Sequence, residues 1–269
     1  MCVNTVAAYE ENRQDGHLQE GLVSYWNERS ASYSDQNVEE MNDHRRDLWR
    51  ELILSHAPAS QADSLRVLDV GTGPGFFAMN LALAGHRVSA VDVTEDMLRH
   101  ARENARAYGA DVDFRQYDGR TLPFEDGTFD LVVSRNVLWN IEEPFAAMQE
   151  WKRVLRKGGR FICFDANWYL YLFDPEQKKR HDEAHRRLHA LYPEEVHDIM
   201  GAEKAAYLED IARKLPLSGI CRPAWDVQAV LRLGMHLAKV DPDLNDRIYR
   251  GSDLIHYTAT PEFMVCAQK

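Results

Sequence analysis

The sequence contains no apolar run long enough to cross a membrane and no basic run long enough to follow a nucleic-acid backbone. Its formal net charge is −11, which disfavours nucleic acid as a partner. The densest basic cluster, Lys178-Lys179-Arg180 with Arg186-Arg187, alternates with acids, as is typical of a solvated helix face. Residues 1–4 turn polar at once and contain no signal-peptide core, so we expect no membrane span and no signal peptide.

Cysteine is scarce, and its spacing matches neither a CxxC pair nor a metal site. The four cysteines are Cys2, Cys163, Cys221 and Cys266. Cys163 and Cys266 fall in predicted strands, where a small hydrophobic side chain is the ordinary interpretation. These features fit a reducing compartment, and we expect a cytoplasmic protein. The sequence also lacks internal repeats and low-complexity segments.

The apolar and polar residues that are present follow an alternating strand and helix pattern. Short apolar runs typical of buried strands lie at 66–70, 87–92, 112–116, 129–134 and 160–164. Helical patterns follow them at 76–84, from Thr94 as N-cap to Gly109, and from Pro144 through Leu155 to Gly158-Gly159. This alternation predicts an α/β fold with a parallel sheet that helices cover on both faces.

The chain is organised around residues 66–77, where a short apolar strand ends beside Asp69 and breaks into glycines at 71, 73 and 75. Glycines in such a turn let a ligand lie against the backbone. A dinucleotide fingerprint would place its third glycine at Phe76, so a nicotinamide oxidoreductase is disfavoured. A carboxylate at Asp69 would repel a pyrophosphate and attract an ammonium group. The residues therefore fit a ligand that has a cationic amine and no pyrophosphate.

Residues 67–75, Val-Leu-Asp-Val-Gly-Thr-Gly-Pro-Gly, resemble the first motif of class I S-adenosylmethionine (SAM) methyltransferases. Within that family, residues 25–33 and the stretch 122–159 are similar to ubiquinone/menaquinone-type small-molecule methyltransferases. The resemblance implies a Rossmann-like, seven-stranded, mostly parallel sheet whose last strand is antiparallel. It also implies an enzyme that transfers a methyl group from SAM to a small-molecule acceptor by in-line SN2 displacement. A SAM-fold protein with other chemistry, or with a regulatory role, is the alternative.

The resemblance also implies the cofactor-binding residues. Asp69 would meet the methionyl ammonium, Asp92 both ribose hydroxyls and Asp118 the adenine amine, although Asp118 is also compatible with an ordinary turn. The other predicted cofactor contacts are Gly71, Thr72, Gly73, Gly75, Val93, Met97, Gly119, Arg135, Asn136, Tyr25 and Tyr33. Met97 equally suits a helix core, and the two tyrosines equally suit burial of the sheet edge.

Four segments describe the expected domain organisation. They are an N-terminal helical segment covering the cofactor site (1–55), the SAM-binding core (56–167), a helical cap insertion (168–222) and the C-terminal part of the core (223–269). Within them we expect loose order over 1–17, one helix over 37–55 and another over 225–233, and the last two strands at 236–240 and 261–266.

Aromatic residues that follow the fifth strand are candidates for the acceptor pocket. The predicted substrate contacts are Trp139, Asn140, Trp168, Tyr169 and Tyr171. Such a lining suits a planar, apolar or cationic acceptor, although some of these rings also suit core packing. His181, His185 and His189 share one helical face, but their context favours an exposed face over a metal site, so we expect no metal. The sequence identifies no general base, no acceptor and no oligomeric state.

Overall fold

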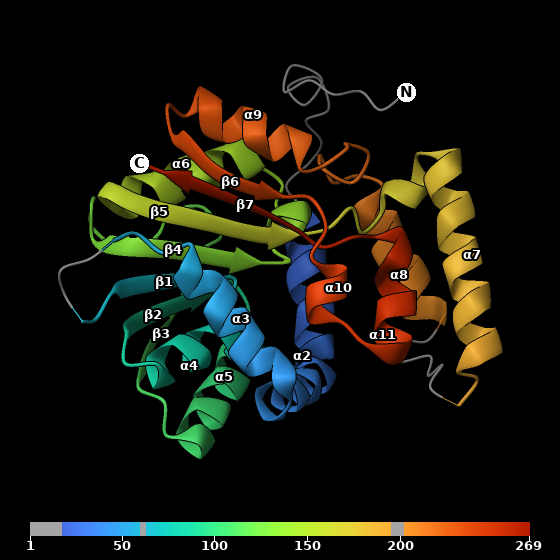
Figure 1. Ribbon diagram of the computed structural model, residues 1–269, viewed down its shortest axis with the longest axis horizontal. Helices are drawn as coiled ribbons and strands as arrows, with labels where there is room; N and C mark the ends of the chain where they lie inside the picture. Colours follow the sequence, from blue (N-terminus) through green and yellow to red (C-terminus); the bar gives the residue numbers. More distant parts are fainter. Residues whose placement is uncertain (1–17, 60–62, 195–201) are drawn as a thin grey trace.

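A computed structural model describes residues 18–59, 63–194 and 202–269. Its centre is a seven-stranded sheet with the order β3-β2-β1-β4-β5-β7-β6 (Figure 1). β7 runs antiparallel to both of its neighbours, and the other neighbouring pairs are parallel. The strands are β1 (Arg66–Val70), β2 (Arg87–Asp92), β3 (Val112–Gln116), β4 (Phe129–Arg135), β5 (Leu155–Asp165), β6 (His236–Asp241) and β7 (Phe263–Gln268). The predicted fold class and the antiparallel last strand are confirmed.

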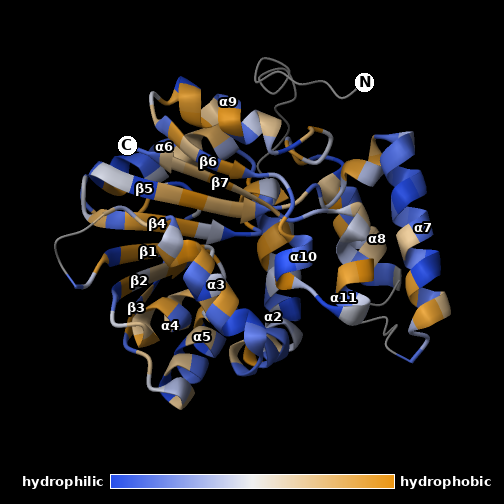
Figure 2. Ribbon diagram, in the orientation of Figure 1, coloured by the Kyte–Doolittle hydropathy of each residue, from blue (hydrophilic) through white to orange (hydrophobic). Residues whose placement is uncertain are grey.

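Helices cover both faces of the sheet, and each face has its own apolar core. On one face lie α6 (Pro144–Val154) and α9 (Ala224–Arg232), whose Trp151 and Trp225 are buried. On the other face lie α3 (His44–Ser55), α4 (Phe76–Leu83) and α5 (Glu95–Tyr108). The central strands β1 and β4 are buried along nearly their whole length because both of their faces are covered, and they stand out as apolar ribbons in Figure 2.

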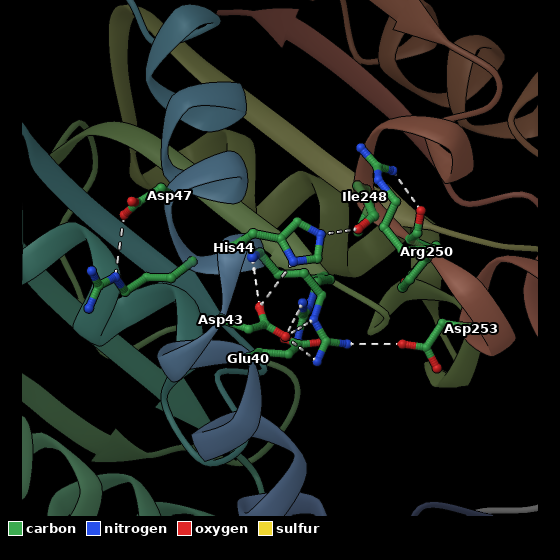
Figure 3. Close-up of polar contacts among 11 residues, drawn as sticks. Glu40, Asp43, His44, Asp47, Ile248, Arg250 and Asp253 are labelled. Atoms are coloured by element: carbon green, nitrogen blue, oxygen red, sulfur yellow. Dashed lines mark hydrogen bonds and ion pairs between the residues drawn. The ribbon is translucent and has the colours of Figure 1, made fainter. Parts of the chain in front are cut away.

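Two helices replace the single helix predicted over 37–55. α2 (Leu18–Asn42) ends before Asp43, whose backbone is extended. The Asp43 side chain caps the start of α3 by accepting a hydrogen bond from the Arg45 backbone amide at 2.7 Å. A short aspartate side chain that binds the next turn is a strong helix start, so the break belongs to Asp43. Figure 3 shows this junction. The expectation for residues 1–17 lies outside the described residues.

β5 begins five residues earlier than predicted. Helix α6 stops at Val154, and Leu155 already pairs with Phe129 of β4. The register then shifts, and the next pair joins Leu131 to Arg160. Gly158 and Gly159 therefore lie within a bulge of the strand and do not end the helix. A Cβ on Gly159 would lie 3.0 Å from two backbone oxygens, which explains the glycine.

The carboxyl ends of the parallel strands are covered by the N-terminal helix and by helical insertions (Figure 1). After β5 come η2 (Leu170–Leu172), α7 (Pro175–Leu191) and α8 (Ala202–Ala212), within the range predicted for a cap. Between β6 and β7 come α10 (Asn245–Ile248), α11 (Gly251–His256) and η3 (Tyr257–Ala259), which the sequence patterns did not indicate. In the three described ranges, no helix combines the length and the apolarity that crossing a membrane requires.

Candidate cofactor site

The glycine turn after β1 has the backbone geometry that its residues predict. Gly71, Gly73 and Gly75 have φ angles of +67°, +53° and +95°, a region that L side chains rarely adopt. A Cβ on Gly71 would lie 2.3 Å from a methyl carbon of Val137. The turn is fixed to the next strand because the Gly71 amide donates to the Val91 carbonyl at 2.8 Å. Gly71 and Gly73 therefore form a side-chain-free wall.

That wall borders a cavity of about 210 Å³ at the carboxyl edge of the sheet. Ten of the predicted site residues line it: Tyr33, Gly71, Gly73, Asp92, Val93, Met97, Gly119, Arg135, Asn136 and Asn140. The cavity also has a lining that the sequence analysis missed, which includes Gln19, Leu22, Val23, Trp26, Tyr117, Val137, Ile141, Glu142 and Glu143. Several of the missed residues share one face of α2, and their helical spacing was a usable signal.

Asp92 ends β2 with its carboxylate in the cavity wall. It is 8% exposed and accepts hydrogen bonds from the Gly73 and Thr94 backbone amides, each at 2.9 Å. Burial raises the pKa of Asp92, and the backbone hydrogen bonds oppose that rise. Thr94 stands at the N-cap of α5, but its hydroxyl makes no capping hydrogen bond, so that part of the prediction is wrong.

Asp69 lies beneath the glycine turn and outside the cavity wall. Its Oδ2 accepts from the Thr72 hydroxyl at 2.7 Å and from the Ala78 amide at 3.1 Å, which ties the turn to the start of α4. Burial raises the pKa of Asp69 to about 6. Thr72 and Gly75 belong to the same buried support and do not line the cavity.

Asp118 does not line the cavity, although Gly119 beside it does. Its Oδ1 accepts from the Arg120 and Thr121 amides at 2.8 Å, and these two bonds lower its pKa. Its carbonyl accepts from the Gln19 side chain at 2.8 Å, which draws α2 over this end of the site. Of the three predicted carboxylates, one lines the cavity, one supports the wall and one shapes the neighbouring turn.

Arg135, the last residue of β4, and Asn136, which follows it, both line the cavity and have unusual surroundings. Arg135 pairs with Glu40 of α2 at 2.8 Å, and its guanidinium lies over the rings of Trp49, Phe76 and Phe77. Asn136 has φ of +59°, and its buried Oδ1 has no hydrogen-bond partner among the described residues. A strained residue with an unpaired oxygen in a cavity wall is typical of a ligand-binding position.

Comparisons with known proteins indicate which family this cavity belongs to. A family profile described as a methyltransferase domain matches residues 68–163. Malonyl-(acyl-carrier protein) O-methyltransferase of Erwinia pyrifoliae is 41% identical over 113 residues, which are 42% of this chain and 40% of that protein. The ubiquinone/menaquinone biosynthesis C-methyltransferase of Desulfotalea psychrophila is 33% identical over 119 residues, which are 44% of this chain and 47% of that protein. These matches span less than half the length of the curated relatives.

Residues 68–163 form a methyltransferase domain. Its fold is that of class I SAM-dependent methyltransferases, so the predicted fold class is confirmed, and the profile match agrees with the predicted family and with SAM as the cofactor. A SAM-dependent methyltransferase from Aquifex aeolicus has a TM-score of 0.53 at 19% identity, covering 86% of this chain and 96% of that one. The (4+2)-cyclase SpnF has a TM-score of 0.54 at 18% identity, covering 83% and 80%. At such identities the likeness shows the fold alone.

The aromatic residues predicted for the acceptor pocket do not line the cavity, and neither does Tyr25, which was predicted as a cofactor contact. Tyr25 and Trp139 are buried in an apolar cluster with residues of α8, and Trp168 and Tyr169 pack against that cluster. Trp168 donates its indole N–H to Asp165 at 3.0 Å. Tyr171 donates to Glu209 of α8 at 2.8 Å. Asn140 lines the cavity itself. Trp139, Trp168 and Tyr169 lie in the cluster that joins α8 to the rest of the protein, and Tyr171 contacts only residues of the range predicted for the cap.

The three histidines of α7 form a row of ring contacts along one side of the helix. His181 stacks on Tyr171 with ring centroids 4.1 Å apart, and His185 and His189 follow along the helix. Within the described residues no group of three or more histidine, cysteine or acidic side chains is placed to hold a metal ion. His185 and His189 are exposed, which agrees with the exposed face expected of them, and His181 is partly covered by Tyr171.

Proposed function

We propose that the protein transfers a methyl group from SAM to a small-molecule acceptor by in-line SN2 displacement. The observation that carries this proposal is the cavity wall in which Gly71 and Gly73 stand beside the buried carboxylate of Asp92. The bare backbone admits a ligand closely, and a carboxylate that ends the neighbouring strand suits a pair of ribose hydroxyls. The family match of residues 68–163 supports the same reading.

The residues around the cavity fit SAM from end to end. Asp92 would accept from the ribose, and Val93, Met97, Tyr117 and Gly119 would enclose the adenine. The unpaired Oδ1 of Asn136 would accept from the methionyl ammonium. Asp69 would act on the same ammonium through the turn that it holds, because its own hydrogen bonds go to Thr72 and Ala78.

When bound, SAM supplies a sulfonium methyl group that is already a reactive electrophile. The protein then has to align a nucleophile with that methyl group and keep water away. The helices α2 and η1 (Leu138–Asn140) border the cavity and are placed to exclude water. The proposed partner is a small molecule and not nucleic acid, and the formal net charge of −11 supports the exclusion of nucleic acid. The proposed location is the cytoplasm.

Titration calorimetry with SAM tests the cofactor site. We expect Asp92→Asn to weaken SAM binding by roughly 10- to 100-fold, because one charged acceptor of hydrogen bonds is lost. Asp96→Asn is the matched control, since Asp96 is exposed on α5 and outside the cavity lining. Equal SAM affinity of wild type and Asp92→Asn would show that the ribose does not bind there.

The alternative is other chemistry on the same fold, as the name of the SpnF cyclase illustrates for that protein. Product analysis separates the two functions. Methyl transfer converts SAM stoichiometrically to S-adenosylhomocysteine as the acceptor gains one methyl group. A SAM-fold enzyme of another kind would convert its substrate and leave SAM intact.

A further inference from the structure

A second hollow lies at the opposite edge of the sheet from the cofactor cavity. It has a volume of about 590 Å³, and it is bordered by α6, by the end of α9 and by the residue that follows β7. Its lining is Phe145, Gln149, Lys152, Arg153, Arg232, Leu233 and Lys269. The two hollows have no lining residue in common. A hollow of this size is within the range of small-molecule sites.

The chain places this hollow at the amino ends of the parallel strands. Lys269 follows β7, which runs antiparallel to β5, and its backbone amide donates to the Gly159 carbonyl in the β5 bulge at 3.0 Å. Lys152 and Arg153 lie in the last turn of α6, directly before β5 begins at Leu155. Figure 1 shows the C-terminus beside α6 and α9, away from the helix α2 that covers the cofactor cavity.

The lining of this hollow is strongly positive. Four of its seven residues are cationic and none is acidic, although the whole chain has a formal net charge of −11. One of the four cations is neutralised, because Arg153 pairs with Glu150 and with Asp126 at 2.8 Å each. The positive charge of the hollow therefore depends on the other three cations.

Two lysines bind helix ends in this hollow and have N–H donors left over. The Lys152 ammonium donates to the Leu233 carbonyl at the end of α9. The Lys269 ammonium donates to the Arg153 and Leu155 carbonyls at the end of α6, at 3.1 and 2.6 Å. An ammonium group has three N–H donors, so two remain on Lys152 and one on Lys269. Neither lysine has an acidic partner in the part of the chain that the structure describes.

Arg232 completes the positive lining. Its guanidinium lies over the Phe145 ring, 5.0 Å from the centroid, and it has no acidic partner within residues 18–59, 63–194 and 202–269. Burial and then the charge of Lys152 lower the pKa of Lys269, and Asp126 opposes this effect only in part. That direction agrees with a positive charge that the lining does not neutralise.

We propose that this hollow binds the phosphate or diphosphate group of a small molecule, in addition to the SAM held at the other edge of the sheet. Three cations without an acidic partner come together here from three separate elements. Phosphate oxygens accept several charge-assisted hydrogen bonds at once, and arginine and lysine are the residues that recognise them. Phe145 and Leu233 supply an apolar wall for the part of the ligand that carries the phosphate. Binding of helix ends explains the two lysines, but it does not explain Arg232, whose contact is with a ring.

Titration calorimetry with inorganic pyrophosphate at low ionic strength tests the proposal. We expect wild type to bind pyrophosphate with a dissociation constant below about 1 mM. Arg232→Glu should weaken this binding by roughly tenfold or more, because an attractive charge becomes a repulsive one. Arg232 is exposed, so the variant should fold, and its circular dichroism spectrum checks this. Arg180→Glu is the matched control, since Arg180 is exposed on α7 and the change in net charge is the same.

A second titration with SAM present shows which hollow the pyrophosphate occupies. Because the two hollows are lined by different residues, SAM should leave pyrophosphate affinity within roughly twofold of its value alone. Displacement of pyrophosphate by SAM would place the anion in the cofactor cavity and overturn the proposal. No binding by wild type, or equal weakening in Arg232→Glu and Arg180→Glu, would overturn it too. Failure of SAM itself to bind would contradict the proposed function and leave this proposal standing.

Discussion

At the scale of single residues, two buried carboxyl groups have a pKa close to neutrality. Burial raises the pKa of Glu262 to about 7 and that of Asp69 to about 6. Both carboxyl groups are buried although a charged carboxylate is costly to bury, and carboxyl groups with a pKa raised in this way are typical of functional sites. Asp69 shapes the glycine turn, whereas Oε1 of Glu262 has no hydrogen-bond partner among the described residues.

The raised pKa of Glu262 predicts how stability depends on pH. The folded state holds this proton up to about pH 7, whereas the unfolded chain releases it near its ordinary value of 4.5. The contribution to the free energy of unfolding therefore falls as pH rises from 4.5 to 7, by up to roughly 3 kcal/mol. Urea unfolding at pH 5 and pH 8 should show Glu262→Gln gaining stability over wild type only at pH 8. An equal difference at both pH values would contradict the assignment.

Gly71 allows a prediction with a closely matched control. Gly71→Ala places a Cβ 2.3 Å from Val137 at φ +67°, whereas Gly109→Ala has a similar φ of +69° and nothing within 4 Å. Both variants bear the cost of a left-handed alanine, about 1 kcal/mol. SAM titration should show binding weakened at least tenfold in Gly71→Ala alone. Equal effects of the two substitutions would mean that backbone strain, and not the cavity wall, is what matters.

At the scale of elements, the parallel core was predictable and two boundaries were not. Strands β1, β2 and β3 match their predicted ranges because a short apolar run between turn residues seldom forms anything but a buried strand. The break at Asp43 was missed because a helical pattern continues across it. The early start of β5 was missed because its first residues are polar and glycine-rich, and only pairing with β4 makes them a strand.

A buried charge cluster joins the end of β5 to the start of α9. Arg222 binds Asp165 at 2.6 Å and holds Asp226 through two hydrogen bonds, and all three side chains are at most 1% exposed. Arg222→Met would leave two buried carboxylates without their cation, so we expect a loss of about 3–5 kcal/mol in the free energy of unfolding.

Arg247→Met is the comparison for this loss. Arg247 pairs with Asp241 at 3.3 Å but is 52% exposed, and such pairs contribute about 0–1 kcal/mol. Urea unfolding of the two variants should separate them clearly. A loss below 1 kcal/mol for Arg222→Met would show that the cluster is solvated or protonated in the folded protein.

At the scale of the whole molecule, the glycine and aspartate part of the cavity wall was foreseeable and the buried pair of Glu262 and Tyr249 was not. Local patterns at the ends of strands predict Gly71, Gly73 and Asp92. The parallel topology brings the carboxyl ends of those strands to the same edge of the sheet. Glu262 and Tyr249 come together only through the pairing of β7 with β5 and the short helices before it. No periodicity marks such a pair, because the two residues are 13 positions apart on irregular backbone.

The central claim is that the cavity lined by the glycine turn and Asp92 holds SAM. A crystal structure of the protein grown with SAM tests it most directly. The account predicts electron density for the ribose at Asp92 and for the methionyl group beside Gly71 and Asn136. Density for SAM elsewhere on the protein, with this cavity filled by side chains, would contradict it.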